Sequence, residues 1–363
     1  MAIEKIKTYG LDDIELVPAT VSDIEHREEC NVYNEDEMLP IFTAPMSSVI
    51  NADNYRIFNQ NKINTIIPRN IEYKKRLEHI NNTFVAMSLS EFSTFIDTLS
   101  QSFSEEQVYY VCIDLANGHM KVLFETCKKA KQLFGGNLVI MTGNIANPKT
   151  YLEYAKCGID FVRVGIGGGS ACITSVQTGV HYGHATLIEE CAKYKKHVID
   201  NWKYNEYQSI PYIVADGGLN CYSKIIKALA LGADYVMIGK LFAECEEACE
   251  DIYTEHKKAS DWTEEDKKHL IWDDNSGTYY VRLRMYYGMS TKIAQKAMGK
   301  TNLKTSEGTV GYVYVKQTLS GWVDNFISYL QTAMSYTNSK TLEEFKCTKT
   351  QLTSVAEFKS YIK

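Results

Sequence analysis

A glycine-rich segment holds the residues of this chain that are best suited to covalent chemistry. The segment is GIGGGSACITSVQTGV, residues 165–180, and it directly follows the apolar run DFVRV. Glycine lets a ligand approach the backbone closely, and successive backbone N–H groups in such a turn form a concavity that binds anions. A helix that begins near Thr174 would add the positive end of its dipole. This setting favours a thiolate at Cys172.

Only the thiolate form of cysteine attacks carbon, so we expect Cys172 to be a nucleophile. The alternative is that Cys172 is a small apolar core residue, which is our interpretation of the other nine cysteines. The ten cysteines form no CxxC pair, which argues against a zinc ribbon and against a disulfide framework.

Two further glycine motifs follow apolar runs and suggest what the thiol acts on. They are ADGG at 215–218 and IGK at 238–240. Asp216 can accept hydrogen bonds from ribose hydroxyls, while Ser170, Gly218 and Gly239 can offer donors to a phosphate. Each motif alone is common at turns, but together with the glycine-rich segment they end three consecutive apolar runs. The sequence therefore predicts a nucleoside monophosphate as ligand.

Eight short apolar runs, which alternate with amphipathic stretches, must position these motifs. The runs cover residues 41–45, 64–68, 83–89, 109–115, 138–144, 160–166, 211–217 and 234–240. This alternation predicts a parallel sheet covered by helices, and eight units suggest an α/β protein with a (β/α)8 TIM barrel. An open, doubly wound sheet also fits the alternation. The polar motifs at successive run ends favour the barrel, because barrel enzymes carry their catalytic groups there.

Three segments depart from the repeating pattern. Residues 246–277 are highly charged and are expected to be a surface insertion, and residues 194–209 are expected to be another. Residues 290–310 contain lysine, glycine and threonine and are a candidate active-site flap. We expect residues 1–363 to form a single catalytic barrel with these segments inserted.

Composition and charge exclude several classes of function. A net charge of −6 gives no basic surface for nucleic acid. The N-terminal residues lack a signal-peptide pattern, and no stretch approaches the ~20 apolar residues that span a bilayer. We therefore expect a cytoplasmic protein with a small-molecule ligand and no membrane or nucleic-acid partner.

Taken together, these motifs resemble those of the inosine monophosphate dehydrogenase and guanosine monophosphate reductase superfamily. The resemblance runs from YGLDDIELVPA and LPIFTAPMSSV through VCIDLANGH, TGNIA, GADYVMIG and YYGMS to SEG, with the glycine-rich segment as its most specific part. It implies a (β/α)8 barrel, usually assembled as a homotetramer. It also implies that Cys172 adds to C2 of a purine, that Asp216 binds the ribose, and that Ser170 and neighbouring glycines bind the phosphate.

The two branches of the superfamily differ after the shared covalent step. Dehydrogenases hydrolyse the thioimidate with an arginine and a tyrosine on a long flap, whereas reductases release ammonia from GMP and then use NADPH. The segment STKIAQKAMGKTNLKTS between Met289 and Glu307 contains no arginine and no Arg-Tyr pair. GMST and SEG resemble the reductase versions, and no regulatory (CBS) domain is inserted after the second apolar run. The resemblance therefore implies an NADPH-dependent GMP reductase.

The resemblance also assigns roles to individual residues. Thr174 and Glu307 would deliver the proton that lets ammonia leave, although Thr174 could simply cap a helix and Glu307 could be an exposed carboxylate. The remaining nucleotide contacts are expected from Met46, Gly217, Gly218, Gly239, Lys240, Tyr286, Gly288, Met289 and Ser290. The nicotinamide side is expected at Asp114, Ala116, Gly143 and Asn144. The carbonyls of Gly167, Gly169 and Cys172 resemble those that hold a monovalent cation, expected to be potassium.

Several positions depart from the family pattern and keep alternatives open. Pro68 and Arg69 stand where reductases have a histidine and a lysine, Gly168 replaces a proline, and TGVHYGH replaces TGVGYPQ. Lys240 stands beside the expected phosphate, where relatives carry serine or glycine. The alternatives are an IMP dehydrogenase without regulatory domains, a reductase of a deoxy or modified guanine nucleotide, and a nucleotide-binding regulatory protein that has lost turnover.

Overall fold

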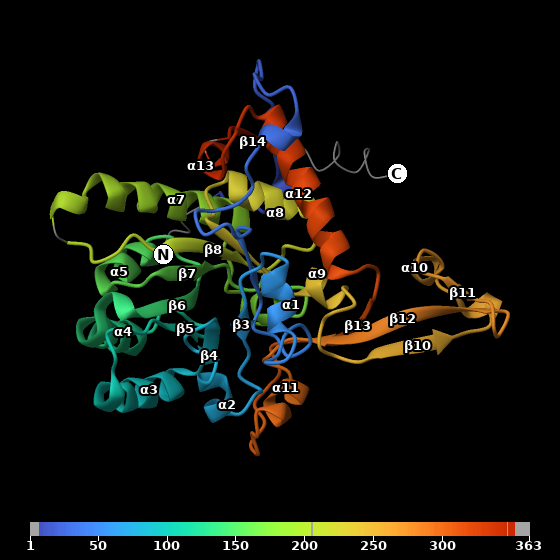
Figure 1. Cartoon of the computed structure of the whole chain (residues 1–363), viewed down its shortest axis with the longest axis horizontal. Coiled ribbons are helices and arrows are strands. Elements are labelled where there is room, and N and C mark those ends of the chain that lie inside the picture. The colour runs from blue at the N-terminus through green and yellow to red at the C-terminus, as the bar shows by residue number, and fades with distance from the viewer. Residues whose placement is uncertain (1–6, 205, 347, 353–363) are drawn as a thin grey trace, which may run out of the picture.

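A closed cylinder of eight parallel strands forms the centre of the molecule (Figure 1) in the computed structural model, which describes residues 7–204, 206–346 and 348–352. The strands are β2 (Ile41–Thr43), β3 (Ile66–Ile67), β4 (Phe84–Met87), β5 (Tyr109–Ile113), β6 (Leu138–Ile145), β7 (Phe161–Val164), β8 (Tyr212–Asp216) and β9 (Tyr235–Ile238). They follow the order β2-β9-β8-β7-β6-β5-β4-β3. Hydrogen bonds from Thr43 N to Asn64 O (2.9 Å) and from Asn64 N to Ile41 O (3.0 Å) close the cylinder. The predicted (β/α)8 barrel is confirmed, and each of the eight apolar runs contains one strand.

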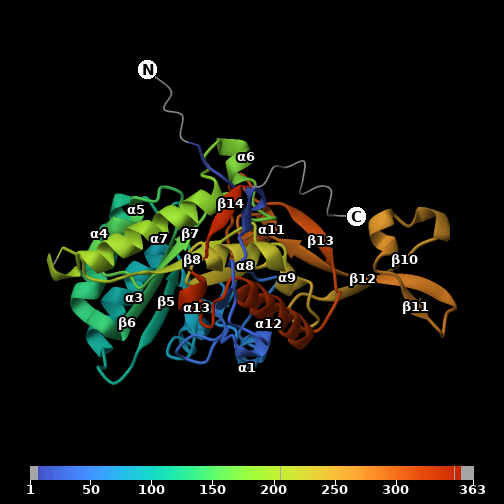
Figure 2. The same ribbon diagram turned by 90° about the horizontal axis from the view of Figure 1, so that it is seen from above.

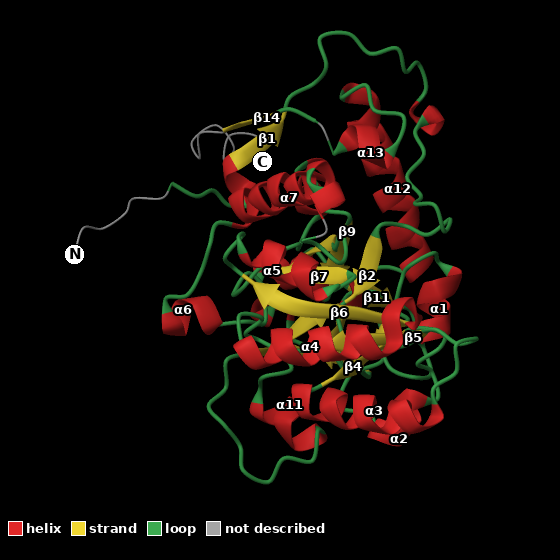
Figure 3. Ribbon diagram, turned by 90° about the vertical axis from the view of Figure 1, so that its left-hand side faces the viewer, coloured by secondary structure: helices red, strands yellow, loops and turns green. Residues whose placement is uncertain are grey.

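Amphipathic helices cover the outside of the cylinder (Figure 3). They are α1 (Tyr55–Gln60), α2 (Tyr73–Leu77), α3 (Leu89–Ser102), α4 (Lys121–Phe134), α5 (Thr150–Cys157), α7 (His184–Asp200), α8 (Tyr222–Ala230), α9 (Lys240–Ala243), α12 (Leu319–Tyr336) and α13 (Leu342–Phe345). The short helix α6 (Thr174–Thr178) has no buried residue and stands away from the cylinder wall (Figure 3). In α4 the buried residues are Leu123, Cys127, Ala130 and Phe134, a spacing of three to four that places them on one face. Only α2 lies between β3 and β4.

Aromatic side chains fill the amino-terminal end of the cylinder. Phe84 and Phe161 are the first residues of their strands, and their rings lie 5.4 Å apart in an edge-on arrangement. Phe42 packs against both, at 5.6 and 5.7 Å. Because this end is packed with rings, the polar groups that end the strands at Asp114, Asn144 and Asp216 lie at the opposite, carboxyl-terminal end.

An antiparallel sheet projects from the barrel as an arm (Figures 1 and 2). Its strands are β10 (Ile252–His256), β11 (Ile271–Asp273), β12 (Thr278–Tyr287) and β13 (Val310–Tyr314), with the short helix α10 (Glu264–Lys267) between β10 and β11. The central strand β12 pairs with the other three. Most of the charged segment 246–277 therefore belongs to this arm, and the segment that was expected to be a flap connects β12 to β13 through α11 (Lys292–Ala297).

The expected insertion at 194–209 needs correction. Residues 194–200 are the last turns of α7, which covers the barrel after β7, and Val198 is fully buried there. Lys196 lies on the outer face of this barrel helix, whereas Lys195 is mostly buried and its Nζ pairs with Asp234 at 2.7 Å. The chain is completed by a small antiparallel pair, β1 (Ile14–Leu16) with β14 (Thr350–Leu352). Among the described helices, none has the length and apolar character needed to cross a membrane.

Candidate active site

A cavity of about 400 Å³ lies at the carboxyl-terminal end of the barrel. Its wall combines the ends of β2, β3, β5, β6, β7 and β8 with the segment between β12 and β13. The residues expected from the sequence that line it are Met46, Asp114, Ala116, Asn144, Gly167, Gly169, Cys172, Thr174, Asp216, Gly217, Tyr286, Gly288, Met289, Ser290 and Glu307. The structure thus brings most of the expected residues to one place.

Cys172, Thr174 and Glu307 form a line of polar contacts on the cavity wall. Cys172 Sγ lies 3.3 Å from Thr174 Oγ1, and that hydroxyl donates a hydrogen bond of 2.9 Å to Glu307 Oε2. All three residues are half-buried. Thr174 is the first residue of α6, but its hydroxyl is directed to Glu307 and does not cap the helix. The arrangement gives a thiol, a hydroxyl and a carboxylate in proton-transfer contact.

Backbone hydrogen bonds hold the carboxylate against the thiol loop. Ile173 N donates to Glu307 O at 2.9 Å, and Thr309 N donates to Ala171 O at 2.9 Å. The residues that bracket Cys172 therefore pair with Glu307 and Thr309, which bracket Gly308, and this pairing brings the side chains of Cys172 and Glu307 together although they are far apart in sequence.

The glycines of the thiol loop are required by close approach. Gly165 has a φ of 131°, and a Cβ there would lie 2.2 Å from the carbonyl oxygen of Asp216.

Two histidines lie beneath the loop, in the motif TGVHYGH that differs from the family pattern. His181 Nδ1 lies 3.1 Å from Ile166 O, and His184 Nε2 lies 3.0 Å from Val164 O. Burial lowers the pKa of His184, so the neutral imidazole is favoured.

Burial supports the interpretation of several other cysteines as core residues, but that interpretation is wrong for Cys221, which is exposed. Cys112, Cys127, Cys191 and Cys245 are fully buried, and burial raises the pKa of each, to about 12 for Cys112. Their thiols therefore stay protonated near neutral pH. Cys221 is exposed but does not line the cavity, and Cys347 lies outside the described residues.

A smaller cavity of about 80 Å³ adjoins the first. Ser170, Gly218, Gly239 and Lys240 line it, together with Asn220, which the sequence did not suggest. Lys240 begins α9 directly after β9, and no carboxylate pairs with its ammonium group among the described residues. The pocket therefore offers an unpaired cation, hydroxyl and amide groups and open backbone, which suit a phosphate.

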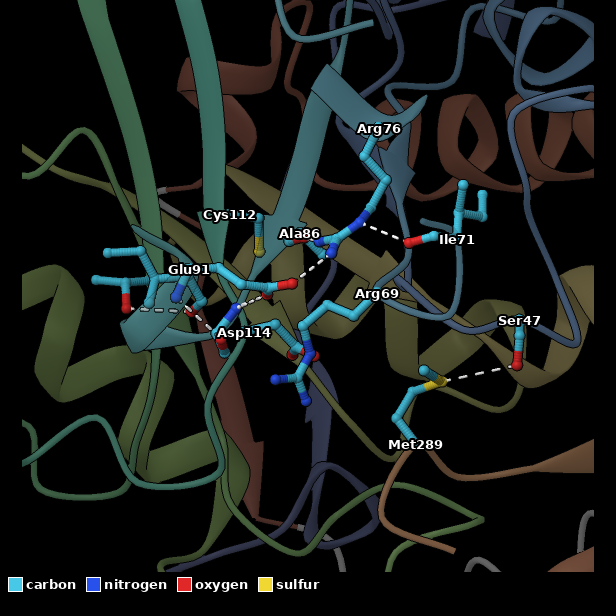
Figure 4. A network of polar contacts seen from close by, with 12 residues as sticks. Ser47, Arg69, Ile71, Arg76, Ala86, Glu91, Cys112, Asp114 and Met289 are labelled. Carbon is cyan, nitrogen blue, oxygen red and sulfur yellow. Dashed lines mark hydrogen bonds and ion pairs between the residues drawn. The ribbon is translucent and has the colours of Figure 1, made fainter. Parts of the chain in front are cut away.

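Apolar and aromatic side chains line the region between the thiol and the smaller cavity. Tyr286 Oη lies 3.6 Å from Met46 Sδ, and Met289 Sδ lies 3.8 Å from Ser47 Oγ (Figure 4). Burial raises the pKa of Tyr286 to about 12, so its hydroxyl remains a donor at neutral pH. This wall offers apolar surface with one hydroxyl, which suits the face of a purine.

Alternating charges link the two sides of the large cavity. Arg163 on β7 donates from Nη1 to Asp114 Oδ1 at 2.8 Å and from Nη2 to Asp216 Oδ2 at 2.9 Å. Asn144 Nδ2 also donates to Asp216 Oδ2, at 2.7 Å. On the far side, Arg69 Nε lies 3.3 Å from Asp114 Oδ2, and Figure 4 shows these two side chains directed toward each other. Both donors to Asp216 engage Oδ2, so Oδ1 remains available to a ligand.

The arginines keep Asp114 ionised despite its position. Burial raises the pKa of the Asp114 carboxyl, but Arg163 and Arg69 outweigh burial and hold it below its usual value. Burial likewise opposes the charge on Arg163, yet Asp216 and Asp114 raise the pKa of its guanidinium above the usual value. Asp114 and Arg163 therefore carry opposite charges near neutral pH.

The loop that carries Arg69 is held by a second buried arginine, Arg76 of α2 (Figure 4). Arg76 Nε donates to Ile71 O at 2.9 Å, and its Nη2 pairs with Glu91 Oε1 at 2.5 Å. A further hydrogen bond joins Arg76 to the carbonyl of Ala86 on β4. These contacts fix the turn after β3, where Arg69 enters the cavity.

Two groups of expected residues differ from the rest in their placement. Gly143 does not line either cavity; a Cβ there would lie 2.5 Å from Arg163 O, so the glycine permits close packing of β6 against β7. The carbonyls of Gly167 and Gly169, expected to hold a cation, accept hydrogen bonds from Ser175 Oγ (3.1 Å) and Cys172 N (2.9 Å). Each oxygen keeps one lone pair, so the cation site stays a prediction.

The sequence analysis missed several charged and polar residues of the cavity wall. They are Arg69, Arg163, Gln295, Lys300, Lys304 and Thr305. A signal for Arg163 was present, because a charged residue within the buried run DFVRV requires partners. Gln295 lies in the short helix α11 and the others lie in irregular segments, where spacing alone does not show which side chains face the site.

Comparison with known proteins agrees with this site. A family model described as "IMP dehydrogenase / GMP reductase domain" matches residues 8–359. A GMP reductase of Oceanobacillus iheyensis is 28% identical over 354 residues, which covers 93% of this chain and 93% of that protein. A GMP reductase of Vibrio cholerae is 25% identical over 363 residues, covering 95% and 94%. GMP reductase 2 of Mus musculus is 25% identical over 334 residues, covering 89% and 86%.

Proposed function

The chain belongs to the IMP dehydrogenase and GMP reductase family of oxidoreductases, and from this premise we propose that it is a GMP reductase that converts GMP to IMP and ammonia with NADPH. The observation that carries the proposal is the contact line from Cys172 through Thr174 to Glu307. It combines a nucleophile with a route for the proton that an amino leaving group needs.

The thiol of Cys172 passes its proton through Thr174 to Glu307, the resulting thiolate attacks C2 of the guanine ring, and the C2–N bond then breaks. An amide-like anion is a very poor leaving group, so a proton must reach the nitrogen as it departs. General acid catalysis of this kind contributes about 10²–10⁴-fold. Thr174 lies between the sulfur and Glu307, so its hydroxyl can pass a proton from the carboxyl group toward the departing ammonia. The product of this step is a thioimidate that joins Cys172 to the purine.

The fit of the nucleotide follows from the two adjoining cavities. Asp216 Oδ1 would accept hydrogen bonds from the ribose hydroxyls, because Arg163 and Asn144 occupy Oδ2. The phosphate would lie in the smaller cavity beside Lys240, and the purine would contact Met46, Tyr286 and Met289. The nucleotide would then span from the phosphate pocket to the sulfur of Cys172.

The other half of the large cavity suits a dinucleotide. Bound NADPH would supply a hydride to C2 of the purine, after which the thiolate leaves and IMP is released. Asp114, Ala116 and Asn144 line this half together with Arg69, Lys300 and Lys304. Lys300 and Lys304 have no ion-pair partner among the described residues, which supports an anionic cofactor at this wall.

Reduction is favoured over dehydrogenation by what surrounds the thiol. The dehydrogenase reaction ends with hydrolysis of the thioimidate, which in that branch uses an arginine and a tyrosine. Residues 290–306 contain neither, and the side chain within reach of Thr174 is the carboxylate of Glu307. A carboxyl group suits protonation of a leaving amine.

An absorbance assay at 340 nm tests the proposal. GMP with NADPH should cause loss of absorbance and release of one ammonia per NADPH, and Cys172→Ala should abolish both. Formation of NADH from IMP and NAD, without ammonia release from GMP, would identify a dehydrogenase instead. A clear preference for dGMP over GMP would identify a deoxynucleotide reductase. Binding of GMP without any turnover would indicate a regulatory protein.

We also propose a bound potassium ion and a homotetramer, because the resemblance to the family implies both. The carbonyls of Gly167, Gly169 and Cys172 would hold the cation. We expect activity to require K⁺ and not to respond to Na⁺. We also expect a mass in solution four times that of the 41.3 kDa chain.

A further inference from the structure

We propose that Gln295 is a positioning residue that holds Glu307 close to the thiol. Its side chain does so by hydrogen bonds that join the beginning of the β12–β13 segment to its end. Gln295 lies within α11 and is 4% exposed. Its side chain is the buried amide of a segment whose other polar side chains mostly face solvent or ligand. The inference rests on the proposed function only for the role of Glu307, since the contacts themselves do not depend on it.

The amide group of Gln295 makes three hydrogen bonds. Nε2 donates to Ser290 O at 2.9 Å and to Lys304 O at 3.2 Å, and Oε1 accepts from Lys304 N at 2.7 Å. One planar amide therefore pairs with both backbone groups of a single residue, as a neighbouring strand would. It simultaneously holds Ser290, which lies on the other side of the segment.

The position of Lys304 determines where Glu307 can lie. Lys304 is three residues before Glu307, and the residues after Glu307 are already bound to the thiol loop through Thr309 N and Ala171 O. Glu307 is thus held from both sides, by the thiol loop on one and by Gln295 on the other. Ser306 adds a local turn by donating to Gly308 O at 2.7 Å.

Loss of the Gln295 amide would release only one of these two anchors. The backbone of Lys304 would lose its hydrogen bonds to the Gln295 side chain. The bonds from Ile173 N to Glu307 O and from Thr309 N to Ala171 O would remain. The carboxylate would then spend less time at 2.9 Å from Thr174 Oγ1. A misplacement of about 1 Å can cost roughly 100-fold in rate, so we expect the loss of this anchor mainly to lower kcat. The ribose and phosphate contacts lie elsewhere, at Asp216 and in the smaller cavity.

The test compares Gln295→Met with the full-length wild type and with Gln331→Met. Gln331 lies on α12, and its Nε2 donates to Cys30 O at 3.1 Å, outside both cavities. We expect Gln295→Met to lower kcat about 10–100-fold with KM for GMP within about threefold, and Gln331→Met to change neither. Hydrogen exchange should be at least about tenfold faster at the Lys304 amide of Gln295→Met than of wild type.

A second variant gives a pH signature that a simple packing role would not produce. In Gln295→Glu, the carboxylate would face the carbonyl oxygens of Ser290 and Lys304, whereas the protonated acid can still donate to one of them. The ratio of its kcat to that of wild type should therefore fall as pH rises from 5 to 8. This variant also carries the test if Gln295→Met does not fold.

Two results would overturn the inference: exchange at Lys304 and kcat of Gln295→Met within twofold of wild type, or a Gln295→Glu ratio independent of pH. Failure of the proposed function is a separate outcome. In that case wild type would not consume NADPH with GMP, while exchange at the Lys304 amide would still decide whether Gln295 holds the segment.

Discussion

Replacement of Arg163 by methionine would test the row of charges that links the two sides of the cavity. Arg163 is the residue that contacts both Asp114 and Asp216 in the described part of the chain. Its side chain is 9% exposed, and the two carboxylates are 14% and 15% exposed. Methionine keeps much of the length of the arginine stem but removes the positive charge and the hydrogen bonds to the two carboxylates, which come from Nη1 to Asp114 and from Nε and Nη2 to Asp216.

The expected loss of stability follows from the burial of these groups. Removing one partner of a buried ion pair costs about 3–5 kcal/mol, because the remaining charge stays buried without compensation. Of the side-chain contacts in the described part of the chain, Asp114 would keep the one with Arg69 Nε at 3.3 Å, and Asp216 would keep the one with Asn144 Nδ2 at 2.7 Å. We therefore expect the free energy of unfolding of Arg163→Met at neutral pH to fall by about 3–5 kcal/mol.

The pH dependence of this loss has a definite sign. In wild type the pKa of Asp114 lies below its usual value, so its contribution is present above pH of about 4 and is lost as pH falls through the folded-state pKa. Without Arg163, burial becomes the larger influence and the pKa of Asp114 rises above its usual value. The contribution of Asp114 to the stability of the variant is then most favourable at low pH and becomes unfavourable as pH rises through the raised pKa. The difference between variant and wild type should shrink toward pH 4.

Urea unfolding of both proteins at several pH values between 4 and 8 measures this difference. Arg282→Met is the matched control, because Arg282 pairs with Glu246 at 2.9 Å on the arm, where the side chains are 28% and 44% exposed. Surface pairs contribute about 0–1 kcal/mol, so this control should change little at any pH. A loss for Arg163→Met that is below about 1 kcal/mol, or that is the same at pH 4 and pH 8, would refute the charge-row argument.

Two further substitutions test the chemistry and the phosphate pocket. Cys172→Ala should abolish turnover and change the affinity for GMP by less than about tenfold. The control Cys221→Ala should leave turnover and affinity unchanged. Turnover by Cys172→Ala would exclude the covalent route. GMP should also protect Cys172, and not the exposed Cys221, from alkylation. Lys240→Ser should raise KM for GMP about tenfold with kcat unchanged, because a charge-assisted contact to phosphate is lost. An unchanged KM would show that Lys240 does not contact the phosphate.

The barrel strands could be located from the sequence because each is buried on both faces. Runs such as YYVCIDL and DYVMIGK are nearly continuous in apolar residues, and β5 and β9 lie within them. Their ends also predicted most of the cavity wall, since parallel strands of a barrel deliver their carboxyl ends to one face. A motif at a strand end therefore fixes position without knowledge of the loops.

The remaining errors have physical causes in particular segments. YKKHVID was interpreted as an insertion because of its charges, yet Val198 supplies the buried face of an amphipathic α7. The strands β10, β11 and β13 were not predicted, because a thin projecting sheet leaves residues such as Tyr253, Trp272 and Tyr312 about half exposed. Contacts of Gln295 or Arg163 depend on which chain segments meet, and no local pattern contains that information.

The charge on the cavity walls shows how an acidic protein can attract two anionic ligands. Five cationic side chains line the two cavities (Arg69, Arg163, Lys240, Lys300 and Lys304) against three carboxylates (Asp114, Asp216 and Glu307), a formal charge of +2 in a chain of net charge −6. The two arginines are neutralised by the two aspartates that they contact. The attraction must therefore come from the three lysines. Lys240 lines the smaller cavity and the other two lie on the β12–β13 segment and line the larger one, so each cavity contains unpaired positive charge for the phosphates of the proposed nucleotide and dinucleotide.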